Sequence, residues 1–295
     1  STIRSINQNS KEVTMYNKIN KILNVILWIV IPYAIVSLSY RHLGPSYAFG
    51  FMILICIALF LTFKAQVYTI WGRKTYMKNH DDGFKYLQKA YDTGKMNPQQ
   101  ALIYAYLLIR DGHIGKAERL ITSIIRQHKD KLTEQNLLAA DLNMAIILWK
   151  KNDLPAAIEK MEYVYSTGYR STVHYGTLGV FYILNNQLER ALEFCLEAYE
   201  YNKADASIAD NLGLVYFKLG EIDKAKEIYS EIFEISSPEF IEAYYNYGQI
   251  FDREENYEKA AEYYRKALGC PEKFLSTVKL AQVEIALSRV EYYLK

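Results

Sequence analysis

The chain has 295 residues, of which 51% are apolar, 14% aromatic and 23% charged, with a formal net charge of +2. Folded proteins average about 45–50% apolar and about 25% charged residues, so this composition excludes a wholly disordered or low-complexity chain. The 14 glycines and 6 prolines are too few for the many turns of an all-β sandwich. Three widely spaced cysteines provide neither a disulfide framework nor a four-cysteine zinc site.

Two long apolar runs come first in the chain, at 22–40 and 43–63, and neither contains a charged residue. A helix needs about 20 apolar residues to cross a bilayer core of about 30 Å, so each run is long enough. The link at 41–46 is short and contains the turn signal Gly44-Pro45, which predicts an antiparallel transmembrane hairpin over 22–63. A cleaved signal peptide and a pair of buried soluble helices are the alternatives. The second run and the length of both runs disfavour them.

The charge distribution predicts the orientation of this hairpin. Residues 1–80 carry nine Lys or Arg and one acidic residue, whereas residues 206–295 carry 11 and 16. The turn contains only Arg41, so the positive-inside rule predicts a cell-membrane protein with two spans. Its N-terminal segment 1–21 and everything after residue 63 would lie in the cytoplasm. Contact with anionic lipid head groups is an alternative role for the basic residues that flank the hairpin. These residues are Arg4, Lys11, Lys18, Lys21, Lys64, Arg73, Lys74 and Lys78.

The rest of the sequence repeats with a fixed period. Gly179, Gly213 and Gly248 stand in similar apolar stretches that are 34 and 35 residues apart. A period of 20–50 residues is typical of a solenoid, and small residues at matching positions let two helices pack closely. Each glycine is followed after twelve residues by an alanine, and pairs of alanines continue the pattern toward the N-terminus: Ala191, Ala225, Ala260, Ala145/Ala157 and Ala105/Ala117. The predicted turns between paired helices are at Gly112, Asn152-Asp153, Asn185-Asn186, Gly220 and Asn256.

The stretches DNLGLVYFKLGEIDKAKEIYSEIFEISSPE (210–239) and NYGQIFDREENYEKAAEYYRKALGCP (246–271) resemble the tetratricopeptide repeat, a helix–turn–helix unit of 34 residues. The resemblance implies an all-α fold in which the repeats form a right-handed superhelix. It divides the chain into five repeats at 98–137, 138–171, 172–205, 206–240 and 241–274. Before them, 64–97 forms a degenerate unit with Trp71 at the usual glycine position, and after them 275–295 is expected to be one capping helix.

The resemblance also implies a concave groove built mainly by the first helix of each repeat. Most side chains at the groove positions are apolar, which favours an amphipathic helix or an apolar segment of a partner over a C-terminal carboxylate. The alternative is that these side chains only pack inside a tight superhelix or against the C-terminal helix. The asparagines among them have a second alternative, which is bonding to backbone groups. The positions are Tyr106, Ile109, Asn143, Ile146, Trp149, Val180, Ile183, Asn211, Leu214, Phe217, Asn246, Gln249 and Arg253.

No catalytic or metal-binding motif accompanies the repeats. The five histidines form no H-E-x-x-H motif, and no phosphate-binding loop or nucleophile elbow occurs. We therefore expect no catalysis, no cofactor, no metal and no nucleic-acid partner. Cys195 is expected to be a buried, inert thiol.

These features together predict a membrane-anchored scaffold or adaptor whose cytoplasmic solenoid binds a protein or peptide partner, with Trp149 and Phe217 in the groove. The alternative function is a constitutive accessory or assembly subunit of a membrane complex. In that case the hairpin, packed against other membrane proteins, is the main interface.

Overall fold

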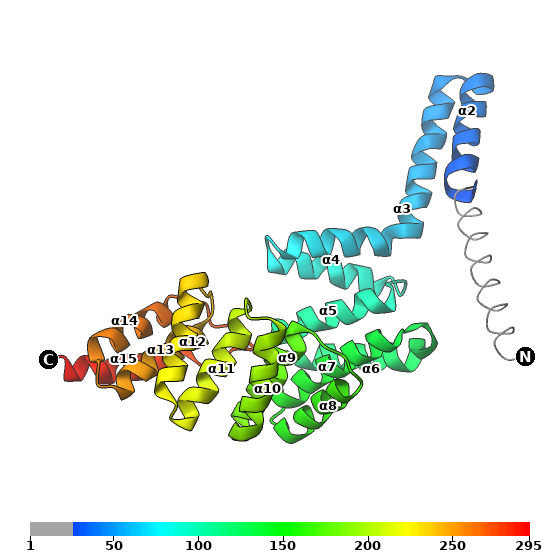
Figure 1. Cartoon of the computed structure of the whole chain (residues 1–295). Helices are drawn as coiled ribbons and strands as arrows, with labels where there is room; N and C mark the ends of the chain where they lie inside the picture. The colour runs from blue at the N-terminus through cyan, green and yellow to red at the C-terminus, as the bar shows by residue number, and fades with distance from the viewer. Residues whose placement is uncertain (1–25) are drawn as a thin grey trace, which may run out of the picture. The chain divides into compact units, whose positions relative to one another are not determined.

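The computed structural model describes residues 26–295, and all regular secondary structure in that range is helical (Figure 1). The chain divides into two units, one up to Asn97 and one from Pro98 to Lys295. The predicted segment 1–21 lies outside the described residues. The unit up to Asn97 contains a short π-helix, η1 (Ile26–Val30), and the helices α2 (Ile31–Leu43), α3 (Pro45–Tyr76) and α4 (His80–Asp92).

Helices α2 and α3 form an antiparallel hairpin around Gly44. Gly44 has φ +95°, a left-handed conformation that glycine adopts without strain, and Pro45 follows as the first residue of α3. Pro32 is the second residue of α2 and directly follows the π-helix η1 in the chain. Trp28 packs edge-on against Phe63, with ring centroids 5.1 Å apart. The predicted turn is therefore where the sequence placed it.

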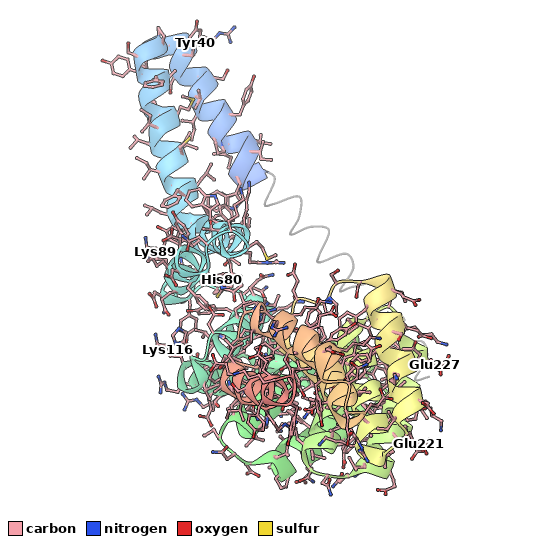
Figure 2. All side chains as sticks on the ribbon, turned by 90° about the vertical axis from the view of Figure 1, so that its left-hand side faces the viewer. Tyr40, His80, Lys89, Lys116, Glu221 and Glu227 are labelled. Carbon is pink, nitrogen blue, oxygen red and sulfur yellow. The ribbon has the colours of Figure 1, made fainter. Side chains whose placement is uncertain are left out.

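Helix α3 is long and apolar enough to cross a membrane, and it meets that criterion alone among residues 26–295. Only 6% of its most apolar 18-residue window is buried. Figure 2 shows side chains projecting from all sides of α2 and α3, with Tyr40 close to the turn. The apolar helix before the turn, Leu27–Leu43, has 17 residues and falls short of the criterion. The prediction of two spans is thus not confirmed, although one candidate span is present.

Helix α3 extends beyond its apolar run, and α4 folds back against this extension. Gly83 allows the closest approach, because a Cβ there would lie 2.4 Å from the Cα of Tyr76. Gly72 makes a similar contact with Leu87, while Trp71 is half exposed and packs edge-on against Tyr86. The small residue that the predicted degenerate repeat lacked at position 71 is therefore at position 72. The helix cap is Asn79, which accepts a hydrogen bond from the backbone N–H of Asp82.

The second unit contains five pairs of antiparallel helices and a terminal helix. Each predicted repeat range contains most of one pair, but the first helix of the second pair begins at Glu134, before the predicted boundary at 138. Small residues lie where paired helices meet. Ala105, Ala145, Ala157 and Ala260 are fully buried. The helices are α5 (Pro98–Arg110), α6 (Ile114–His128), α7 (Glu134–Lys150), α8 (Leu154–Ser166), α9 (Thr172–Leu184), α10 (Leu188–Tyr201), α11 (Ala206–Leu219), α12 (Ile222–Ile235), α13 (Ile241–Arg253), α14 (Tyr257–Leu268) and α15 (Leu280–Tyr293).

The turns inside the pairs depend on left-handed residues. Gly112, Gly220, Asn152 and Asn186 have positive φ, as expected at turns where glycine and asparagine are tolerated. In the last pair the left-handed residue is Glu255, whereas the predicted turn residue, Asn256, caps α14 by accepting from the N–H of Lys259. Between the first and second pairs, a short 3₁₀ helix, η2 (Lys129–Lys131), precedes the capping box of Thr133.

The predicted capping helix 275–295 is shorter than expected. Helix α15 begins at Leu280 and packs against α14 through Val283 and Val290, which are fully buried. Residues 270–279 are not helical. Pro271 disfavours helical backbone at the residue before it, and Glu242 of α13 accepts the backbone N–H of Thr277, so this amide is used outside a helix. Leu275 and Val278 therefore do not lie on the capping helix.

We expect Gly213→Ala to lower the stability of the solenoid by about 1–2 kcal/mol, because small-to-large changes in packed cores cost about 1–3 kcal/mol and alanine regains part of this through helix propensity. A Cβ at this position would lie 2.7 Å from the ring of Tyr229, which is fully buried. Thermal unfolding followed by circular dichroism measures the effect as a drop of several degrees. Gly176→Ala is the control, because its Cβ would meet only Ser207 Oγ at 3.4 Å. Equal melting temperatures for the two variants would contradict this account.

Candidate functional site

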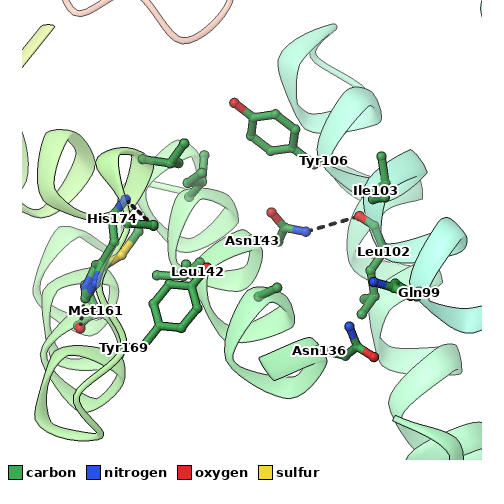
Figure 3. Close-up of a pocket in the computed structure, with 14 residues that line it drawn as sticks. Gln99, Leu102, Ile103, Tyr106, Asn136, Leu142, Asn143, Met161, Tyr169 and His174 are labelled. Carbon is green, nitrogen blue, oxygen red and sulfur yellow. Dashed lines mark hydrogen bonds between the residues drawn. The ribbon is translucent and has the colours of Figure 1, made fainter. Parts of the chain in front are cut away.

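The first helices of the five pairs, α5, α7, α9, α11 and α13, carry a common surface that we call the first-helix face. Two cavities lie between these helices. Cavity A, of about 350 Å³, lies between α5, α7 and the start of α9 (Figure 3). It is lined mainly by apolar side chains, and three predicted groove residues, Tyr106, Asn143 and Ile146, are among them. The full lining is Gln99, Leu102, Ile103, Tyr106, Asn136, Ala139, Leu142, Asn143, Ile146, Met161, Tyr169, Ser171, Val173 and His174.

Cavity B, of about 230 Å³, lies between α9, α11 and the start of α13. The predicted groove residues Val180, Asn211 and Leu214 line it. The other side of this cavity is formed by residues 273–277 of the same chain. The lining from the helices and their flanks is Gly176, Val180, Ser207, Asp210, Asn211, Leu214, Phe240 and Glu242.

The predicted asparagines tie neighbouring first helices together. Asn143 Nδ2 donates to the carbonyl of Leu102 at 3.3 Å (Figure 3), and Asn211 Nδ2 donates to the carbonyl of Gly176 at 2.8 Å. Asn246 Nδ2 donates to Asp210 Oδ1 at 3.0 Å. All three side chains are buried, and their amide donors are used within the solenoid. Of the alternatives left open by the sequence, the structure favours the one in which these residues bond groups of the scaffold.

Other predicted groove residues have partners inside the chain. The rings of Trp149 and Phe181 lie 5.3 Å apart, and the guanidinium of Arg253 lies 5.7 Å from the ring of Phe217. Gln249 donates to the hydroxyl of Tyr245 at 3.3 Å. Trp149 and Phe217 are half-buried, so each retains some accessible surface. Ile109 and Ile183, in contrast, are almost fully buried, so the structure places them in the core and not on the first-helix face.

His174 is a cavity A residue that the sequence did not single out. Its side chain is only 1% exposed, and its Nε2 lies 3.0 Å from the carbonyl oxygen of Met161, to which it donates. Burial lowers the pKa of this imidazole below its ordinary value, although the bonds to backbone carbonyls of Met161 and Tyr169 oppose the shift. At neutral pH the ring is therefore uncharged, and cavity A has no cationic lining residue.

Asp210 is the second residue that sequence analysis missed. It is buried beside cavity B, and its Oδ1 accepts hydrogen bonds from Tyr229 at 2.8 Å and Asn246 at 3.0 Å. Burial raises the pKa of this carboxyl to about 7, and the nearby carboxylate of Glu242 adds to the shift, although the two hydrogen bonds oppose it. The sequence did contain an indication of this residue, because Asp210 is the one acidic residue within α11 (206–219).

We expect Asp210→Asn to weaken the dependence of stability on pH. The folded chain retains a proton on Asp210 between about pH 4 and 7 that the unfolded chain has released, so this group stabilises the fold less as pH rises through that window. On lowering the pH from 8 to 5.5, the wild-type chain should gain about 1–2 kcal/mol relative to the variant. Thermal unfolding of both proteins at both pH values measures the change in stability. Subtracting the change in the variant from that in the wild type removes the contribution of the other titrating groups. Identical pH dependence for both proteins would contradict this assignment.

Residues 26–295 contain no group of three His, Cys, Asp or Glu side chains placed to hold a metal ion. Cys195 is buried behind Gly179, and burial raises the pKa of its thiol to about 12, which agrees with the expectation of an inert thiol. Cavity A thus offers apolar surface and a few polar groups, whereas the lining of cavity B also includes Asp210, Glu242 and Lys273.

Comparison with known proteins agrees with this fold. Residues 205–273 match the family model described as the tetratricopeptide repeat. The matched range contains the helix pairs α11/α12 and α13/α14. No curated protein matches the sequence significantly.

Three solved structures similar to this one extend the likeness beyond the matched repeats. A tetratricopeptide-repeat protein from Parabacteroides merdae ATCC 43184 is 12% identical, with a TM-score of 0.60 over 88% of this chain and 98% of its own. TTC0263, a thermophilic repeat protein of Thermus thermophilus, is 20% identical, with a TM-score of 0.52 over 66% and 100%. PilF of Pseudomonas aeruginosa is 15% identical, with a TM-score of 0.52 over 67% and 84%. At these identities the likeness shows the fold alone.

Proposed function

We propose that this protein is a membrane-anchored adaptor whose solenoid binds a segment of a partner protein on the first-helix face. Tetratricopeptide repeats generally mediate protein–protein interactions. The observation that carries the proposal is cavity A, which is lined by the first helices α5, α7 and α9 and has an apolar wall with few polar groups. Such a lining suits the apolar side chains of an amphipathic helix or an extended segment. The role is one of binding, without catalysis or a cofactor.

The membrane anchor in this proposal is the hairpin of α2 and α3. The support is the length and composition of α3 and the many apolar side chains that the hairpin leaves exposed, such as Leu38 at 61% and Leu54 at 62%. A water-soluble protein rarely leaves so large an apolar surface uncovered. The basic residues that follow the apolar part of α3 support a cytoplasmic position for the solenoid. Anchoring would concentrate a bound partner at the membrane.

Partner binding is tested with charged substitutions on cavity A. Ile103 and Val173 line it and are 37% and 54% exposed, so a glutamate at both positions alters the surface without filling the core. Burial of an unpaired carboxylate costs several kcal/mol, so we expect at least a tenfold loss of co-purifying partner with Ile103→Glu/Val173→Glu. The measurement is affinity purification of the full chain in mild detergent with quantitative mass spectrometry.

The matched control for this experiment is Leu196→Glu on the second helix α10, where an equally exposed leucine lies outside both cavities. The control should retain the partner. A partner that both variants retain in fixed stoichiometry would contradict the adaptor proposal and favour a constitutive complex subunit held through the hairpin.

Orientation is tested by cysteine labelling of intact cells that express the chain. Ser46 lies at the start of α3 beside the turn and is exposed, and Cys270 lies shortly after the end of α14. A membrane-impermeant maleimide should label Ser46→Cys in intact cells, because the turn would lie outside, and should reach Cys270 only after permeabilisation. The unmodified chain is the control for Cys56, which the bilayer would shield. Labelling of Cys270 before permeabilisation would rule out a cytoplasmic solenoid.

A further inference from the structure

The first-helix face is partly covered by a segment of its own chain. Residues 271–279, which we call the strap, connect α14 to α15 without forming a helix. Lys273, Leu275, Ser276 and Thr277 of the strap line cavity B opposite α9 and α11. The strap therefore lies where the predicted groove would receive a partner.

Hydrogen bonds hold the strap at one carboxylate. Glu242 Oε1, at the start of α13, accepts from the backbone N–H of Thr277 at 2.6 Å and of Val278 at 3.4 Å. It also accepts from the hydroxyl of Thr277 at 3.3 Å. Three donors of the strap thus converge on this single oxygen. Two backbone amides bound to one carboxylate do not depend on side-chain identity, so other extended segments can make the same contact.

An aromatic contact holds the strap further along the face. A Cβ at Gly112, just after α5, would lie 3.0 Å from Cδ2 of Phe274, so the ring rests against this backbone. The ammonium of Lys150, at the end of α7, lies 5.0 Å from the centre of the same ring and 3.8 Å from that of Trp149. The strap thus reaches from the fifth repeat to the first two repeats.

The strap fits this face incompletely. Phe274 remains 38% exposed, and cavity B, of about 230 Å³, remains between the strap and the helices. Lys150 is half-buried near Lys279 of the strap, and burial together with this like charge lowers its pKa to about 8. A close-packed interface would leave neither an open cavity nor two like charges near each other. This combination of specific anchors and poor filling suits a segment that can be displaced.

We propose that the strap is an intramolecular ligand of the first-helix face, and that the partner is an extended protein segment of the same chemistry that displaces it. Such a segment places an aromatic side chain against Gly112 and Lys150 and donates two successive backbone amides to Glu242. This inference rests on the proposed function, because it names the partner class and its regulation at the same face. The strap keeps the face covered until a partner outcompetes it, which limits binding to well-matched segments.

The test measures binding of a fluorescein-labelled peptide with the strap sequence PEKFLSTVK to the full chain in mild detergent. Wild-type chain should bind it weakly, because the tethered strap competes at high effective concentration. Phe274→Ala in the chain weakens the strap and leaves the face intact, so we expect about tenfold tighter binding. Adding Glu242→Ala should reverse this gain. Ile285→Ala on α15, an exposed apolar residue outside the strap, is the matched control and should behave as wild type.

A second measurement does not depend on a variant. Saturating peptide should speed hydrogen exchange of the Thr277 and Val278 amides in the wild-type chain, since displacement removes their acceptor. Unchanged exchange at saturation, or equal affinity of wild type and Phe274→Ala, would overturn the inference. If the peptide results are negative while Ile103→Glu/Val173→Glu still abolishes partner capture, the strap inference fails and the adaptor proposal stands. If Ile103→Glu/Val173→Glu retains the partner and the peptide does not displace the strap, both the adaptor proposal and the strap inference are overturned.

Discussion

The solenoid depends on the close approach of two paired helices at a small residue on the first helix. In each of the last three repeats a glycine on the first helix faces a large or polarisable side chain of the second. A Cβ on Gly213 or Gly248 would lie 2.7 Å from the ring of Tyr229 or Tyr264, and a Cβ on Gly179 would lie 3.1 Å from the sulfur of Cys195. Because these rings and the sulfur are buried, the spacing of each pair cannot relax without opening the core. The first helix of each pair therefore has a fixed position against the next pair.

Polar side chains on the first helices convert this stack into a continuous surface. Asn143, Asn211 and Asn246 each bond a group on the preceding first helix, so neighbouring repeats are joined where a partner would bind. Their donors are therefore used by the scaffold, which leaves recognition to shape and apolar contact in cavity A and to the carboxylate of Glu242 near cavity B. Asp210 belongs to the same network and is retained in a buried position by Tyr229 and Asn246.

The strap adds a level of control to this surface. The strap is held by the carboxylate of Glu242, which accepts hydrogen bonds from backbone amides, and by Gly112, against which the ring of Phe274 packs. Both contacts could be made by an incoming segment as well as by the strap itself. The free energy of partner binding would then be reduced by the free energy with which the strap binds in cis. An adaptor at a membrane, where the anchor raises local concentration, benefits from such a threshold against weak partners.

The sequence by itself determined the helical class, the period of the repeats, the turn at Gly44 and the small residues at the helix contacts. These follow from local rules, because period, glycine and proline act within a few residues or repeat along the chain. Only the tertiary structure decided which groove positions are buried, that Asp210 and His174 lie beside cavities, and that residues 271–279 cross the first-helix face. Those facts depend on contacts such as Glu242 with Thr277 and Gly112 with Phe274, which join residues far apart in the chain. Helical periodicity assigned Leu275 and Val278 to a cap, but Pro271 and a single distant carboxylate gave that segment another conformation.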